Sequence, residues 1–174
     1  LAGFCVGIVE KSRIIQPKRV RPGDRLIGLA SSGPHSNGYS LIRKVLEVSG
    51  ADLAAPLGDT SLGAALLEPT RIYVKPLLAV GKELEIHALA HITGGGIPEN
   101  VIRVIPDSCG LPMFEGSWEV PPVFAFLQAA GRVSDREMKR AFNNGLGLIA
   151  VVPDKSTDEV LDRLNGMDEK AFLV

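Results

Sequence analysis

Serine, histidine and asparagine side chains crowd into a short loop between an apolar run and a helical pattern. The loop follows Ala30 and reads Ser31-Ser32-Gly33-Pro34-His35-Ser36-Asn37-Gly38. Its two glycines permit positive φ and let the main chain approach a ligand closely. Such a loop between a strand and a helix can present the helix N-terminus to an anion. A tight turn with serine and asparagine as helix caps explains the same residues equally well, so both interpretations stay open.

Within this loop, His35 and Asn37 are the candidate catalytic residues, and we expect both to point into a cleft. Histidine exchanges protons near neutral pH more readily than other side chains. An asparagine amide offers donor and acceptor together to an amide-like substrate. The candidate substrate- or phosphate-binding positions of the same loop are Ser32, Gly33, Ser36 and Gly38. A merely solvated loop histidine is the simpler alternative for His35.

A second candidate loop reads His91-Ile92-Thr93-Gly94-Gly95-Gly96 and also follows an apolar run. Three consecutive glycines indicate a loop with special geometry, because each costs about 0.5–1 kcal/mol in a regular element. Their amides and the Thr93 hydroxyl predict a phosphate site. No Lys-Ser/Thr pair follows, so this is not a Walker A loop, and the spacing does not match a dinucleotide fingerprint. His91 is a further candidate, although a core histidine at a strand end would look the same.

Composition indicates one globular domain of 174 residues without a strong overall field. With 19 basic and 20 acidic side chains the net charge is −1, so we expect neither nucleic acid nor an anionic membrane as partner. Cys5 and Cys109 form no CxxC pair, and no ligand set surrounds His87 and His91, so we expect no metal site, no disulfide and a reduced cytoplasm. No apolar run has the length of a membrane span.

The elements that must position these loops alternate along the chain. Apolar alternation and apolar runs predict strands over residues 4–9, 25–30, 86–92, 111–114, 118–120 and 146–152. Helical periodicity predicts helices over residues 39–48, 62–67, 72–80, 123–130, 135–141 and 158–164, with a further helix starting near Pro98. The order suggests an α+β domain in which helices cover at least one face of a sheet. The first residue is not methionine, so we expect the chain to begin inside a longer protein.

Several segments, taken in order, resemble the AIR synthetase (phosphoribosylformylglycinamidine cyclo-ligase) family. They read LAGFCVG from residue 1, SSGPHSNGYSLIRK from residue 31, PTRIYVK from residue 69 and AHITGGG from residue 90. Glu99-Asn100, the RVIP run from residue 103 and Ala141-Phe142-Asn143 continue the similarity, which covers essentially the whole chain. The ordered set is far more specific than any one of its members.

The resemblance implies an ATP-dependent ring closure of formylglycinamidine ribonucleotide to aminoimidazole ribonucleotide in purine biosynthesis. ATP phosphorylates an amide-type oxygen, a neighbouring nitrogen attacks the activated carbon, and phosphate leaves. Positioning and charge stabilisation are then the main tasks of the protein. The residues implied for substrate or phosphate binding are those of the two loops together with Asn143.

The resemblance also implies how the chain fits into a larger enzyme. Residues 1–174 would form the C-terminal domain, with residues 1–15 as the connection from an N-terminal domain. That domain would hold ATP and Mg²⁺ and form a homodimer, and the substrate cleft would lie between the two halves. The C-terminal domain would have layered α/β/α architecture with a mixed, partly ferredoxin-like sheet. On its own, this half should fold but not catalyse.

Two departures and three rivals accompany this interpretation. Relatives commonly have cysteine or methionine where this chain has Asn144, so no role of a thiol carries over. The family continues beyond Val174, so the last strand is expected to be incomplete. The rival functions are a domain of formylglycinamidine ribonucleotide synthetase, a non-catalytic phosphate-binding module, and a structural interaction domain with no ligand at either loop.

Overall fold

A four-stranded antiparallel sheet forms the centre of the computed structural model, which describes residues 3–110, 112–114 and 116–174. The strands lie in the order β4-β5-β1-β6, and each neighbouring pair is antiparallel. They comprise β1 (Arg25–Ala30), β4 (Ala88–His91), β5 (Leu146–Val152) and β6 (Ala171–Leu173). The mixed sheet expected from the resemblance is thus an antiparallel one.

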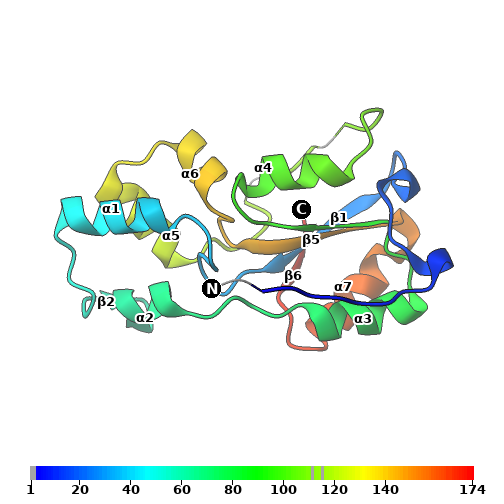
Figure 1. Ribbon diagram of the computed structural model, residues 1–174, viewed down its shortest axis with the longest axis horizontal. Helices are drawn as coiled ribbons and strands as arrows, with labels where there is room; N and C mark the ends of the chain where they lie inside the picture. Colours follow the sequence, from blue (N-terminus) through cyan, green and yellow to red (C-terminus); the bar gives the residue numbers. More distant parts are fainter. Residues whose placement is uncertain (1–2, 111, 115) are drawn as a thin grey trace.

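Both faces of this sheet are covered, which explains why its central strands are apolar throughout. All seven residues of β5 are buried, as are the last five of β1. One face packs against α3 (Val74–Glu83) and α7 (Thr157–Asn165), and the other packs against α4 (Gly96–Val101), as Figure 1 shows. Because side chains alternate along a strand, Ile27 and Leu29 join the first layer while Leu26 joins the second. The layered α+β fold is confirmed.

The path of the chain through the sheet follows the split βαβ arrangement. Numbered along the chain, the four strands lie in the order 2-3-1-4, and the helices α3 and α7 that precede β4 and β6 contact each other on one face. These are the features of a ferredoxin-like sheet. The partly ferredoxin-like character implied by the resemblance is therefore present.

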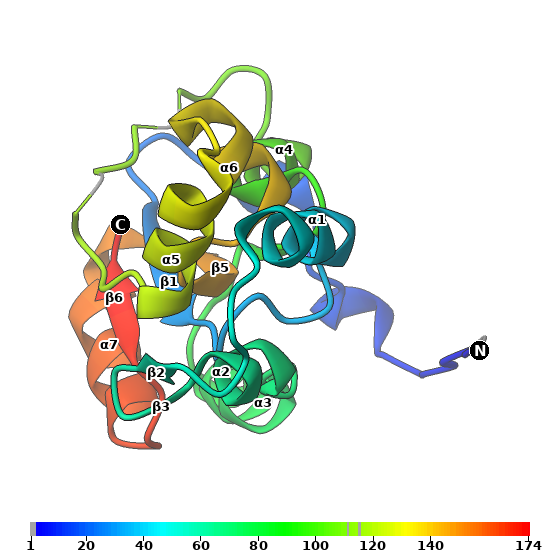
Figure 2. The same cartoon turned by 90° about the vertical axis from the view of Figure 1, so that its left-hand side faces the viewer.

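A second group of helices lies at one end of the sheet, where Figure 2 views it end-on. It contains α1 (Tyr39–Ser49), α2 (Leu62–Leu67), α5 (Pro122–Gly131) and α6 (Asp135–Ala141), with a small hairpin of β2 (Pro56–Leu57) and β3 (Thr60–Ser61). Their core centres on Phe124 and Phe142, whose ring centroids are 5.9 Å apart. Four 3₁₀ turns complete the described elements: Lys11–Arg13, Pro17–Arg19, Ile102–Val104 and Asp154–Ser156.

Three predicted strands are not found among the described residues. Residues 4–9 form no strand, because they pair with no other segment in the described chain, and Phe4 is fully exposed. Residues 112–114 and 118–120 also form no strand, and Leu111 lies outside the described residues. There, Met113 and Trp118 are anchored individually against the α4 side of the sheet. No helix among the described residues is long and apolar enough to cross a membrane.

Candidate functional site

The two glycine-rich loops lie at the same end of the sheet because of strand direction. The strand β5 is antiparallel to both β1 and β4, so the ends of β1 and β4 meet the start of β5. In the register, Ala30 pairs with Leu146 and His91 pairs with Leu148. The loop after Ala30, the loop after His91 and the turn at residues 142–145 therefore converge on one site.

Asn143 connects the turn before β5 to the first loop through its buried side chain, which is 1% exposed. Its Oδ1 accepts hydrogen bonds from the Ser31 hydroxyl and the Gly145 amide, each at 3.0 Å. Its Nδ2 donates to the carbonyl of Gly33 at 2.9 Å. The amide of Asn143 is thus occupied by the protein itself, so its predicted role in substrate binding gains no direct support from this geometry.

Close packing against the segment 139–142 explains one glycine in each loop. A Cβ on Gly38 would overlap the Phe142 ring, and a Cβ on Gly96 would overlap the backbone of Lys139. Both glycines also have positive φ, 76° and 63°. These positions require glycine for packing and backbone angle, whatever ligand binds nearby.

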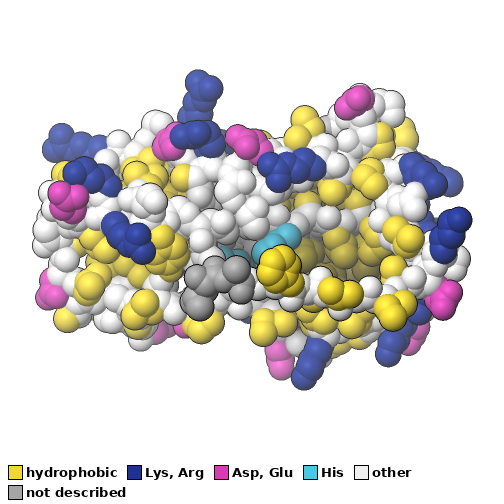
Figure 3. Space-filling view, viewed as in Figure 1, with side chains coloured by type: hydrophobic (Ala, Val, Ile, Leu, Met, Phe, Trp, Pro, Cys, Tyr) yellow, Lys and Arg dark blue, Asp and Glu magenta, His cyan; other side chains and the backbone are white. Residues whose placement is uncertain are grey.

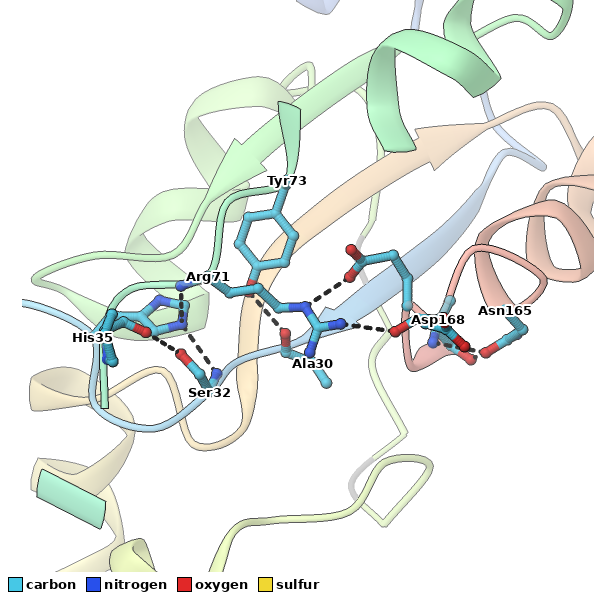
Figure 4. A network of polar contacts seen from close by, with 10 residues as sticks. Ala30, Ser32, His35, Arg71, Tyr73, Asn165 and Asp168 are labelled. Atoms are coloured by element: carbon cyan, nitrogen blue, oxygen red, sulfur yellow. Dashed lines mark hydrogen bonds and ion pairs between the residues drawn. The ribbon is translucent and has the colours of Figure 1, made fainter. Parts of the chain in front are cut away.

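Residues 68–73, which we call the strap, form hydrogen bonds with three polar side chains of the first loop. Figure 4 shows those of Ser32 and His35. The Ser32 hydroxyl donates to the Pro69 carbonyl at 2.6 Å. The hydroxyls of Ser36 and Thr70 lie 3.2 Å apart. Ser32 and Ser36 were predicted as ligand-binding residues, and the structure gives their side chains partners within the chain.

His35, one of the two predicted catalytic residues, is buried, with 3% exposure. Its Nε2 accepts hydrogen bonds from the backbone amides of Ser32 at 3.1 Å and Arg71 at 3.5 Å. Burial, aided by the charges of His91 and Arg71, lowers the pKa of His35 to about 4. The ring is therefore neutral at physiological pH, and the solvated loop histidine considered from the sequence is excluded.

The strap is itself anchored by residues that sequence reasoning did not assign to the site. The Arg71 guanidinium donates to the Glu169 carboxylate and to the Asp168 carbonyl, both at 2.8 Å. The Tyr73 hydroxyl donates to the carbonyl of Ala30 at 2.8 Å, and burial raises the pKa of Tyr73. The PTRIYVK segment carried part of the family resemblance, and it was the only sequence signal for this anchor.

Asn37 and His91 contrast with these residues, because neither side chain forms a hydrogen bond within the described chain. His91 is exposed, and Asn37 is partly exposed. Figure 3 shows histidine surface near the middle of the face seen in Figure 1. The helix α1 starts directly after Asn37 with Gly38 as its N-cap; it has neither a side-chain cap nor an acidic residue in its first turn. This combination leaves an amide, an imidazole and a helix N-terminus available to a ligand.

The glycine run at residues 94–96 is held mainly by one side chain. Asn100, which is 5% exposed, donates from Nδ2 to the carbonyls of Thr93, Gly94 and Gly96, and its Oδ1 accepts from the Thr93 hydroxyl. The amides of Gly95 and Gly96 donate to the Arg140 and Thr93 carbonyls. Within the described chain, only the Gly94 amide of the three remains without an acceptor. The run can therefore offer an anion one amide rather than a complete cradle.

Neither loop is accompanied by a ligand set for a metal. Among the described residues, no three histidine, cysteine or acidic side chains gather closely enough to hold an ion. Glu99, the carboxylate in the first turn of α4, stands alone beside the glycine run. The described residues therefore include no cluster of three such ligands at either loop.

A large apolar cavity of about 690 Å³ lies outside this polar site. It opens between α4, α5, α6 and the segment before α5, and its lining includes Ile97, Trp118, Phe124 and Met138. It meets the turn before β5 only at Asn144. The cavity offers few polar groups, so the converging loops remain the better candidate for a phosphorylated ligand.

A split βαβ sheet with two glycine-rich loops converging at one end defines the class of domain. Residues 21–174 match the family model described as AIR synthase related protein, C-terminal domain, and the chain belongs to that family. Over all 174 residues it is 53% identical to a phosphoribosylformylglycinamidine cyclo-ligase of Nitrosococcus oceani. It covers 49% of that relative, so the chain spans about half the length of the curated relative it matches.

Asn144, the residue that departs from the family pattern, has a structural explanation. Its φ of 47° is in the left-handed region, which asparagine tolerates better than most residues. Its Nδ2 donates to the carbonyls of Met138 and Phe142, at 3.0 and 3.2 Å, and so satisfies the end of α6. Its own carbonyl accepts from the Trp118 indole at 2.9 Å.

We therefore expect Asn144→Ala to lower the free energy of unfolding by about 1–2 kcal/mol, because it adds backbone strain to the loss of two hydrogen bonds. Asn144→Gly is the matched control, because it removes the same bonds but accepts the positive φ. Urea unfolding of both variants should give the smaller loss for Asn144→Gly. Equal losses would show that the backbone angle contributes nothing.

Proposed function

We propose that the chain is the C-terminal half of an ATP-dependent cyclo-ligase that converts formylglycinamidine ribonucleotide to aminoimidazole ribonucleotide in purine biosynthesis. The observation that carries the proposal is the 53% identity across the whole chain to a protein with the cyclo-ligase name. The convergence of the two family loops at one end of the sheet supports it. No observation favours the formylglycinamidine ribonucleotide synthetase, the non-catalytic module or the purely structural domain.

The reaction requires a division of labour between the two halves of the enzyme. ATP and Mg²⁺ are assigned to the preceding half, since the described residues hold no carboxylate cluster at the loops. That half also forms the homodimer, and the whole enzyme works in the cytoplasm. This chain then supplies one wall of the cleft, which binds and orients the ribonucleotide.

On this side of the cleft, we assign the substrate contacts to the polar groups that have no hydrogen-bond partner in the described chain, which we call the uncommitted groups. The N-terminus of α1 and the Gly94 amide would bind the substrate phosphate, because both offer N–H groups without an acceptor in the described chain. The Asn37 amide would hold the amide-like part of the substrate, and His91 would lie at the entrance. These contacts orient the substrate for attack by its own nitrogen.

The docking surface for the preceding half includes residues 3–9. Phe4, Val6 and Ile8 are each at least 95% exposed, and alternate residues share one face of an extended chain. In Figure 2 this segment extends away from the body of the domain, and the family match begins only at residue 21. Such a row of apolar side chains would be buried as a strand in the sheet of the preceding half.

The proposed reaction is tested with the whole parent enzyme and with residues 1–174 alone. Given formylglycinamidine ribonucleotide, ATP and Mg²⁺, the whole enzyme should form aminoimidazole ribonucleotide. The isolated chain should show folded circular dichroism and no product, because it lacks the groups that hold Mg²⁺–ATP. Product formation by the isolated chain would show that the assignment of the ATP site to the preceding half is wrong. A whole enzyme inactive with this substrate would refute the proposed function.

Gly94→Val in the whole enzyme should raise the KM for the ribonucleotide roughly tenfold, about 1.4 kcal/mol, with little change in stability. The reason is that a Cβ at Gly94 meets nothing within 4 Å, so only an approaching ligand would feel the new side chain. Gly110→Val is the control, because a Cβ at Gly110 also meets nothing within 4 Å and this residue lies outside both loops. Gly95→Val is less informative for two reasons. Its new Cβ would overlap the Glu99 side chain, and its φ of 96° disfavours any residue other than glycine. An unchanged KM for Gly94→Val would contradict the phosphate contact.

Phe4→Glu should leave the stability of the isolated chain unchanged, because the side chain touches no other described part of it. In the whole enzyme the same change should lower the melting temperature by several degrees, since it would bury a charge in the interface between halves. Val48→Glu, at an exposed position of α1, is the control. Equal melting temperatures for Phe4→Glu and Val48→Glu whole enzymes would rule out this docking surface.

A further inference from the structure

The hydrogen bonds of His35 fix the tautomer of its ring. Both amides that point at Nε2, from Ser32 and Arg71, are donors and cannot accept a proton. A ring nitrogen that accepts such bonds uses its lone pair, so in the neutral imidazole the proton must sit on Nδ1. That Nδ1 is buried and has no hydrogen-bond partner in the described chain. The ring is therefore a neutral acceptor on one edge and an unpaired donor on the other.

The surroundings of the ring oppose its protonation. A second proton would be placed on Nε2, facing two N–H groups that now donate to it. The charged and titratable groups around the ring are Arg71 on the strap, His91 at the end of β4 and Tyr73, whose ring lies 6.2 Å away. Glu169 is the carboxylate in this network, and it is held by Arg71. Burial, His91 and Arg71 together lower the pKa of His35 to about 4.

The ring is also fixed in place by packing. It lies over Gly147 of β5, where an added Cβ would come within 2.5 Å of the His35 Cε1 atom. The His35 backbone has φ 56°, a left-handed angle that costs a non-glycine residue energy and persists only where the surroundings impose it. A group that transfers a proton must reach the substrate, whereas this ring is enclosed between a strand and the strap.

The loop geometry that His35 imposes ends at Asn37. The backbone N–H of Asn37 donates to the Pro34 carbonyl at 3.3 Å, which closes a turn around His35. Gly38, the next residue, is pressed against Phe142 and starts α1. The Asn37 side chain leaves this turn without a partner in the described chain. The fixed backbone on both sides therefore sets the direction of its Cα–Cβ bond.

We propose that His35 is a positioning residue, which as a neutral Nδ1–H imidazole ties its loop to the strap and so presents the Asn37 amide to the substrate, without transferring a proton. The inference rests on the proposed function for the identity of the substrate. The tautomer and the protonation state of His35 do not depend on it. His35 thus connects the strap and the loop, because its Nε2 accepts hydrogen bonds from both.

The first test is the NMR spectrum of the whole enzyme labelled with ¹⁵N-histidine, with His35→Gln used to assign the signals. At pH 7 the Nε2 of His35 should have the shift of an unprotonated, pyridine-type nitrogen, and Nδ1 that of a protonated, pyrrole-type nitrogen. The pattern should persist down to about pH 5. A protonated Nε2, or titration of His35 between pH 6 and 8, would overturn the proposal without touching the proposed reaction.

The second test compares His35→Gln with His35→Ala in the whole enzyme. The glutamine oxygen can replace Nε2 as the acceptor but cannot act as an acid or base near neutral pH, so kcat should stay within about threefold of wild type. Its pH profile of kcat/KM between pH 6 and 9 should keep the wild-type shape. Were His35 a proton carrier, the same variant should lose roughly 100-fold or more and one limb of the profile.

His35→Ala removes the acceptor and should lower kcat at least about tenfold, as should Asn37→Ala, and the double variant should be no worse than the poorer single one. Fully additive losses would show that His35 does not act through Asn37. If His35→Ala does not fold, His35→Gln and the NMR spectrum still decide the question. A wild-type enzyme without activity on this ribonucleotide would refute the substrate and leave the NMR result standing.

Discussion

The position of β5 between β1 and β4 is the constraint on which the site depends. Because β5 is antiparallel to both neighbours, its start lies beside the ends of both: Leu146 pairs with Ala30 and Leu148 pairs with His91. In the sequence, α1, the β2–β3 hairpin, α2 and α3 separate the loop after β1 from the loop after β4. The pairing of both strands with β5 brings the two loops to the same end of the sheet. Asn143, in the turn before β5, joins this turn to the first loop with two buried hydrogen bonds, and a third, from the Gly145 amide, holds the turn itself. A buried amide that lost these partners would be costly, so the convergence is strongly held.

Most of the polar residues at this site serve the loops themselves rather than a ligand. Ser32, His35 and Ser36 bond to the strap, while Asn100 holds the glycine run. Loops rich in glycine lack side-chain packing, and these internal hydrogen bonds replace it. Among the described residues, the groups at the surface of the loops without hydrogen-bond partners include the Asn37 amide, the His91 imidazole, the Gly94 amide and the N-terminus of α1. Rigid loops with a few uncommitted groups are well suited to orienting a substrate, because little order remains to be gained on binding.

The sequence predicts the regular elements better than it predicts the roles of the polar residues. Helices and long buried strands have periodic or continuous apolar patterns, so α1, α7 and β5 were found close to their observed bounds. Residues 4–9 have the same alternation as a strand, but alternation cannot say whether a partner is present. Likewise, the residue types at His35 and Ser32 fit both ligand binding and loop closure. Only the positions of Arg71 and Pro69 distinguish the two, and these follow from packing of the strap, which has no periodic signal.

The apolar cores of the domain form without its N-terminal segment. Its sheet and helix clusters close around apolar cores that include no residue before Val20. The exposed apolar segment at residues 3–9 therefore adds nothing to these cores, and its burial depends on another surface. The uncommitted groups of the two loops also point to contacts beyond the described chain. Under the proposed function, both features assign these further contacts to the substrate and to the preceding half of the enzyme. In the proposed enzyme, this half would bring to the ribonucleotide two loops already held by their own hydrogen bonds, rather than loops that fold around the substrate.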